Sequence, residues 1–402
     1  MKRKVKVSSI FDILMLISLG AFLFYCFWYQ YAVGEIKGIM SFFGIEILLL
    51  DFYYLMRGRK IKYLAAIIGF LLIAAVSGYI FSPDNYLLSE MILRIIQYCI
   101  PMFGIYFYIN GEKKKLEHIM ICLAAAVSAM SIALLLSGTY NSMGALVLGD
   151  LNANVFSSVL LLGLISYFYL LDNGRAFYIR AILVILIILG LVSQVLAASR
   201  RGVVVYVFYI FTYIHSLLAI KYRKNALYKL MTLLLVITVL LIICLNINWQ
   251  ELTIISEFQR GVLGGDDLRH SYQAEAWNIF KDNPVFGGGL GVVWTRIGAY
   301  SHSFYFELLS CTGLVGTLVL LCTLGKWLLY FFKASEQYSS IDKAYALRTR
   351  TMAWGLVCVF VTGLAVVYIY DINFYVLLGI FAAFRQACDS QRVELGKEEI
   401  SK

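Results

Sequence analysis

Residues 181–198 read AILVILIILGLVSQVLAA and contain no charged side chain. An apolar run of roughly 18–20 residues is long enough to cross a bilayer as an α-helix. Nearly continuous apolar runs also occur at 119–136 and 231–245. Backbone groups within lipid must find hydrogen-bond partners in the protein, and a helix provides them within one segment. These stretches therefore predict a helical membrane protein.

The composition extends this prediction to the whole chain. Of its 402 residues, 61% are hydrophobic and 14% are charged, whereas soluble domains average about 45–50% and about 25%. We expect an all-α polytopic helical bundle that forms a single transmembrane domain over residues 1–402. Its twelve predicted spans are 10–29, 36–56, 63–81, 86–109, 116–137, 152–171, 178–198, 202–220, 228–248, 303–331, 351–370 and 372–386.

Basic residues fall on alternate loops of this bundle. One side carries Lys2, Arg3, Lys4, Lys6, Arg57, Arg59, Lys60, Lys62, Lys113, Lys114, Lys115, Arg175, Arg180, Lys221, Arg223, Lys224, Lys229, Lys333, Lys343, Arg348, Arg350, Arg385, Arg392, Lys397 and Lys402. The other side carries only Lys37, Arg200, Arg201, Arg260, Arg269, Lys281 and Arg296. Because cytoplasmic loops are enriched in Lys and Arg, both termini are predicted to be cytoplasmic. The net charge of +10 then reflects membrane orientation, and no nucleic-acid partner is expected.

The last two spans are the least certain part of this topology. Only Asp371 and its neighbours are available to turn the chain between them. Ten spans followed by a re-entrant pair is therefore an open alternative.

One extracytoplasmic loop, 249–301, is much longer than the others and lies between the ninth and tenth spans. An amphipathic helix is expected near 267–282, ended by Pro284, and it suits the membrane interface. The next segment reads NPVFGGGLG at 283–291 and is expected to be a flexible turn. It does not predict a nucleotide site, because no strand precedes it and no GxxxxGK[ST] motif occurs.

Arginines on the predicted outer side are candidates for binding phosphate. Arg200 and Arg201 occur in ASRRG at 198–202, between two apolar helices, and Arg269 opens the surface helix. A guanidinium group matches phosphate oxygens with a planar fork of donors. The alternatives are arginines that reach lipid phosphates from a helix end, for Arg200 and Arg201, and a solvated loop charge, for Arg269.

Two further ionisable sites deserve a functional interpretation. His302, in YSHSFY at 300–305, is placed at the outer membrane boundary, where an imidazole can act as a base or a hydrogen-bond partner; a structural role is the alternative. Arg94 lies within the fourth span and is a candidate for the same reason that any intramembrane charge is. Glu90 is one helical turn away, so a structural ion pair is the alternative for Arg94.

Taken in order, these residues resemble the O-antigen polymerase and ligase superfamily of bacterial surface polysaccharide assembly. The similar stretches are SRRG at 199–202; Arg269, Trp277 and NPVFGGG at 283–289; SHSFY at 301–305 with TGLVG at 312–316; and DLNAN at 150–154, which contains Asn154. They cover mainly residues 150–320. The family usually has Asn after the histidine, whereas this chain has Ser303, whose hydroxyl can still donate and accept a hydrogen bond.

The resemblance implies a metal-independent, cofactor-free glycosyltransferase in the bacterial cytoplasmic membrane. It implies that Arg200 and Arg269 bind the diphosphate of an undecaprenyl-diphosphate-linked glycan at the outer face, with help from Arg201. His302 would orient or deprotonate the acceptor hydroxyl, giving inversion at the anomeric carbon. Cationic groups around a charged leaving group stabilise the transition state directly. Ser303, Trp277, Asn154 and Arg94 are expected to support this site.

The favoured function is polymerisation of lipid-linked repeat units into an O-antigen, capsule or exopolysaccharide. A ligase that transfers a finished glycan to another acceptor uses the same chemistry, and the sequence does not separate the two. A lipid-linked oligosaccharide flippase is the alternative from another class, but it would be expected to show related halves with midplane binding residues. No internal repeat is found, and the polar candidates cluster after residue 198. The resemblance also implies flippase and chain-length regulator proteins as partners, besides membrane lipid.

Overall fold

The computed structural model describes residues 7–34, 38–82, 84–141, 144–149, 152–171, 176–221, 229–230, 233–234, 237, 267–364 and 366–400. Eight helices within these residues are long and apolar enough to cross a membrane, which confirms an all-α polytopic membrane protein. The elements are α1 (Val7–Phe24), the π-helix η1 (Tyr25–Tyr29), α2 (Gln30–Ala32), α3 (Ile39–Met56), α4 (Ala65–Phe81), α5 (Asn85–Ile109), α6 (Lys113–Ser137), β1 (Thr139–Tyr140), β2 (Leu146–Val147), α7 (Ala153–Leu171), α8 (Phe177–Leu196), α9 (Arg200–Lys221), α12 (Asp267–Asp282), α13 (Val292–Ile297), α14 (Phe304–Tyr338), α15 (Lys343–Thr362), the 3-10 helix η3 (Tyr368–Tyr370) and α16 (Ile372–Ile400).

A helix lies within each predicted span that the structure describes, although the bounds differ for the span at 351–370. The span at 228–248 lies almost wholly outside the described residues, as do residues 249–266 of the long loop. The count of twelve spans and the orientation of the termini therefore stay predictions. A helix, α12, occupies the residues where the surface helix is expected.

The predicted bounds of the span at 351–370 are wrong. The helix there, α15, begins at Lys343 and ends at Thr362, because the backbone leaves the helix to meet α14. The carbonyl of Gly363 accepts the N–H of Phe304 at 2.8 Å. The turn expected at Asp371 is present, since its Oδ1 accepts the backbone N–H and the side-chain amide of Asn373 at the start of α16.

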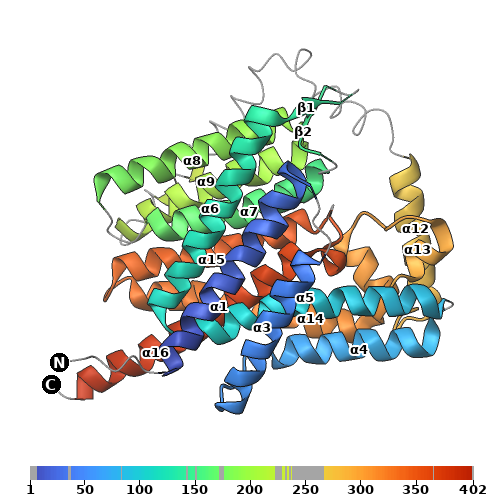
Figure 1. The fold of residues 1–402 in the computed structure, drawn as a ribbon, viewed down its shortest axis with the longest axis horizontal. Helices are drawn as coiled ribbons and strands as arrows, with labels where there is room; N and C mark the ends of the chain where they lie inside the picture. The colour runs from blue at the N-terminus through green and yellow to red at the C-terminus, as the bar shows by residue number, and fades with distance from the viewer. Residues whose placement is uncertain are drawn as a thin grey trace.

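One group of helices in the bundle packs around α7 (Figure 1). In its most apolar window, 78% of the residues are buried, and α7 contacts α6, α8, α9 and α15. At the lower right of the view α14 packs against α4, and α5 packs along α16, which runs towards the lower left. The short helices α12 and α13 lie near one end of this second group, where α14 begins (Figure 1).

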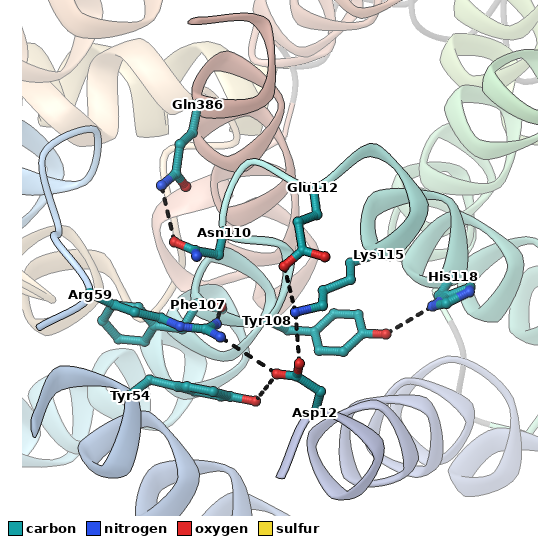
Figure 2. A network of polar contacts seen from close by, with 10 residues as sticks. All are labelled: Asp12, Tyr54, Arg59, Phe107, Tyr108, Asn110, Glu112, Lys115, His118 and Gln386. Carbon is teal, nitrogen blue, oxygen red and sulfur yellow. Dashed lines mark hydrogen bonds and ion pairs between the residues drawn. The ribbon is translucent and has the colours of Figure 1, made fainter. Parts of the chain in front are cut away.

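A polar network ties helix ends together far from α12 and α13. Asp12 of α1 accepts a hydrogen bond from Tyr54 at 2.7 Å and pairs with Lys115 at 2.8 Å and Arg59 at 3.5 Å (Figure 2). Lys115 also pairs with Glu112 at 2.8 Å. The basic members lie on the loops that the charge pattern predicts to be cytoplasmic. This network therefore fixes the packing of α1, α3 and α6, and it is no part of the candidate site.

Candidate functional site

The glycine-rich segment at 283–291 is not the flexible turn that its composition predicts. Gly288 and Gly289 donate their N–H groups to the carbonyls of Ser310 and Cys311 in α14, at 2.7 and 3.0 Å. Residues 287–291 are all buried. A Cβ on Gly287 would lie 2.5 Å from the carbonyl carbon of Cys311. Because glycine has no side chain, the two backbones can approach closely. Their hydrogen bonds then hold the segment in place.

Helix α14 is broken at Gly313, which has φ 58° and ψ −163°. The break removes helical partners from the next two N–H groups. Leu314 donates instead to Pro284 at 2.9 Å, and Val315 donates to Val285 at 3.1 Å. Irregular backbone at membrane depth is tolerated where protein satisfies its polar groups. The NPVFGGG and TGLVG motifs thus form one hydrogen-bonded unit.

This unit is also attached to α4 and α5. The hydroxyl of Ser77 in α4 donates to the carbonyl of Phe286. A Cβ on Gly289 would lie 2.7 Å from the Cα of Gly78, and one on Gly291 would lie 3.3 Å from Leu87. The segment therefore enters the bundle between the ends of these two helices.

His302 lies in a tight turn directly before α14. Its φ is 55°, in the left-handed region that non-glycine residues rarely adopt. The Ser301 hydroxyl donates to the carbonyl of Ser303 at 2.9 Å, which closes the turn. The imidazole ring stacks on Tyr272 of α12, with ring centroids 5.9 Å apart. Tyr272 follows Arg269 by three residues in the same helix, so the structure brings His302 to the second turn of α12, about one turn beyond Arg269.

Glu307 is a candidate that the sequence interpretation missed. Its side chain is fully buried, and its Oε2 accepts the N–H of Ser301 at 2.9 Å. The Sγ of Cys311 lies 3.9 Å from Oε1 of Glu307 and 3.5 Å from the hydroxyl of Tyr370. Tyr370 in turn accepts the N–H of Gly291 at 2.8 Å. The available signal was that Glu307 is the sole charged residue between positions 303 and 325.

The Asn154 motif lies beside the SRRG junction. Ser157, one turn after Asn154 in α7, shares a hydrogen bond with Ser199 at 2.6 Å and accepts another from Gln194 at 2.5 Å. A Cβ on Gly202 would overlap the Gln194 amide, so a side chain there would displace the end of Gln194. The structure thus brings together two stretches that the sequence separates. The side chains of Arg200, Arg201 and Arg269 lie outside the described residues, and their approach to His302 stays a prediction.

The remaining candidates have clear partners. Trp277 is 41% exposed, and its ring lies 5.0 Å from that of Phe280 and 6.4 Å from that of Phe306. Arg94 forms the expected ion pair with Glu90, at 3.2 Å. Ser303 is buried and precedes α14 without capping it through its side chain. A role for these residues in substrate binding stays a prediction.

Arg296, another arginine on the predicted outer side, is held by carboxylates. It pairs with Glu275 and Asp282 of α12, both at 3.2 Å. The neighbouring Glu275 carboxylate raises the pKa of Arg296 above its usual value. The contact between α12 and α13 explains this arginine without a substrate.

The aromatic side of the site includes Tyr300 and Tyr370, whose ring centroids lie 4.9 Å apart. Burial raises the pKa of Tyr300. Burial also raises the pKa of the nearby Asp371 carboxyl to about 6, although hydrogen bonds from Asn373 oppose the shift.

The fold and this site define a polytopic membrane protein in which a glycine-rich segment enters the bundle and completes a broken helix. Residues 182–321 match the protein-family model described as O-antigen ligase. This match places the segment from α8 to the middle of α14 in the O-antigen polymerase and ligase superfamily, and it includes Arg200, Arg269 and His302.

Comparison with whole proteins adds little to the family match. No curated protein matches the chain. Similarity is found to a chain in a solved structure titled "Structural coordination of polymerization and crosslinking by a peptidoglycan synthase complex". The TM-score is 0.46 and the identity is 15%, over 82% of this chain and 98% of that chain.

Proposed function

We propose that the protein is a membrane glycosyltransferase that polymerises undecaprenyl-diphosphate-linked repeat units into a surface polysaccharide at the outer face of the cytoplasmic membrane. The observation that carries the proposal is the family match over residues 182–321. The geometry supports it, because His302, the surface helix α12 and the glycine-rich segment converge at the start of α14.

The residues suit an inverting displacement. The acceptor hydroxyl oxygen attacks the anomeric carbon as its proton passes to the imidazole of His302. The bond from the anomeric carbon to the diphosphate oxygen breaks, and the diphosphate leaves with the electron pair. Arg200 and Arg269 stabilise this developing negative charge, which is the role that preorganised cationic groups perform best in a site with little water. The activated donor supplies the free energy, so the step requires no ATP.

The experiment uses the purified full chain with lipid-diphosphate-linked repeat units, and products are resolved on a gel. A ladder of longer glycans supports polymerisation. His302→Ala and Arg269→Ala are expected to abolish the ladder while inserting normally into membranes. Arg296→Ala is the matched control, an arginine of the same region whose partners are the carboxylates of α12, and it should retain the ladder. If both site variants make wild-type amounts and lengths of product, the proposed site is wrong.

A second candidate is a ligase, which the description of the matching family favours. Transfer of a preassembled glycan to a different acceptor, without elongation of repeat units, would support the ligase over the polymerase. Movement of the lipid-linked glycan across a bilayer with the glycan unchanged would instead indicate a transporter.

A further inference from the structure

We propose that Glu307 is a positioning residue, whose buried carboxylate holds the turn at Ser301–Ser303 so that His302 keeps the backbone conformation needed for transfer. The inference rests on the proposed function for what His302 does. It rests on the structure alone for what Glu307 holds.

The conformation of His302 needs support from its surroundings. Positive φ at a residue with a side chain is unfavourable and persists only where neighbouring interactions fix it. The peptide N–H before His302 is held by Glu307, at 2.9 Å. The carbonyl after it, on Ser303, is held by the Ser301 hydroxyl. Hydrogen bonds therefore fix the chain on both sides of His302. From outside the turn, the Ser303 carbonyl also accepts the backbone N–H of Glu307 at 3.0 Å, and the Glu307 carboxylate is the side chain that holds Ser301.

Packing alone does not explain an acidic residue at this position. Glu307 is fully buried in an otherwise uncharged stretch, and burying such a group is unfavourable unless it is hydrogen-bonded. A leucine would fill the same space without that cost. The carboxylate faces a backbone donor that leucine could not satisfy, which accounts for the acid.

The position of Glu307 also links the turn to the glycine-rich segment. Cys311 lies between Glu307 and Tyr370, and Tyr370 accepts the N–H of Gly291. Because Glu307 is fully buried, it has no surface on which to meet an acceptor sugar. It acts through His302, which is only partly buried, and so it is not itself a catalytic residue.

The test compares Glu307→Leu, Glu307→Gln and Leu324→Ala in the purified full chain. Glutamine retains an oxygen that can accept the Ser301 N–H, whereas leucine does not. Leu324 is fully buried in the same helix, so Leu324→Ala reports destabilisation of α14 without a change at the turn. Turnover is divided by the number of sites that bind a radiolabelled lipid-diphosphate-linked repeat unit. This division corrects for protein that has lost its fold. Hydrogen exchange of the peptide containing Ser301 reports the turn directly.

In Glu307→Leu we expect exchange at this peptide to rise at least tenfold. Turnover per donor-binding site should fall at least tenfold, equivalent to about 1.4 kcal/mol, with donor affinity unchanged. Glu307→Gln should stay within about threefold of wild type, and Leu324→Ala should keep its turnover per site. Unchanged exchange or unchanged turnover per site in Glu307→Leu would overturn the inference, as would equal loss in Glu307→Gln. If the wild-type protein neither binds nor transfers the donor, the proposed function fails, and with it the role in transfer. The hydrogen-exchange measurement still decides whether Glu307 holds the turn.

Discussion

Replacing Gly313 with alanine should damage the protein far more than replacing a second glycine of the same helix. At Gly313, with φ 58° and ψ −163°, a side chain is strained by about 1–3 kcal/mol. The added Cβ would lie 2.6 Å from the backbone nitrogen of Gly287 and would also overlap the carbonyl of Val285. Overpacking of this kind costs about 1–3 kcal/mol more. Gly313→Ala is therefore expected to lower the free energy of unfolding by about 2–6 kcal/mol.

Gly325 provides the matched control. It lies in the regular part of α14, and a Cβ there would meet nothing within 4 Å. Gly325→Ala should stabilise the helix by about 0.5–1 kcal/mol, because alanine loses less backbone entropy than glycine. The two variants carry the same chemical change in one helix and are expected to shift stability in opposite directions.

The assay is the fraction of detergent-solubilised protein that remains monodisperse after heating, together with the glycan ladder. Gly313→Ala should lose thermal resistance and form glycan ladders poorly, since the added Cβ fits only if the backbone at 284–287 moves away from α14. Gly325→Ala should match or exceed wild type in both measurements. Equal thermal resistance in the two variants would refute the hydrogen-bonded unit at Gly313.

Three further outcomes are expected. Burial raises the pKa of Asp371 to about 6, so the stability that this carboxyl contributes is full below about pH 4 and is lost as pH rises through about 6. The thermal resistance of Asp371→Asn relative to wild type should therefore increase as pH rises between these values. A difference between the two proteins that does not change with pH would contradict this. Asp12→Asn removes the charged partner of Arg59 and leaves Lys115 with Glu112 as its carboxylate partner. It should lower stability by about 1–3 kcal/mol, with turnover per site unchanged, because the network lies at the end of α5 away from the glycine-rich segment. Arg296→Ala removes exposed ion pairs, so a stability loss above about 1 kcal/mol would be unexpected.

The sequence predicts the helices well because their cause is local. Long uncharged runs such as 181–198 cannot satisfy their backbone in lipid except as helices, and α8 is found there. The ion pair of Glu90 with Arg94 is equally local, since residues four apart share a helix face. The extent of α12, Asp267–Asp282, agrees with the amphipathic pattern near 267–282 and with the proline at 284 that ends it.

The glycine-rich segment could not be predicted in the same way. Glycine in a sequence is compatible with a loose turn and with close contact between backbones, and only the partner decides between them. For Gly287 and Gly313 the partners are each other's segments, 26 residues apart in the chain. The bounds of α15 failed for a related reason, because its end is set by contact with Phe304 in α14 rather than by the apolar pattern.

Pairing between these segments gives a physical reason why their order carried the family resemblance. Pro284 and Val285 accept hydrogen bonds from Leu314 and Val315, while Gly288 and Gly289 donate to the turn before Gly313. An insertion within either segment would shift its donors and acceptors out of register with the other. Residues between the two segments, including His302 and the first turn of α14 with Glu307, then lie in a stretch whose two ends are fixed. The fixed ends allow a short turn to hold a histidine at positive φ, so the broken helix serves the candidate site as well as the fold.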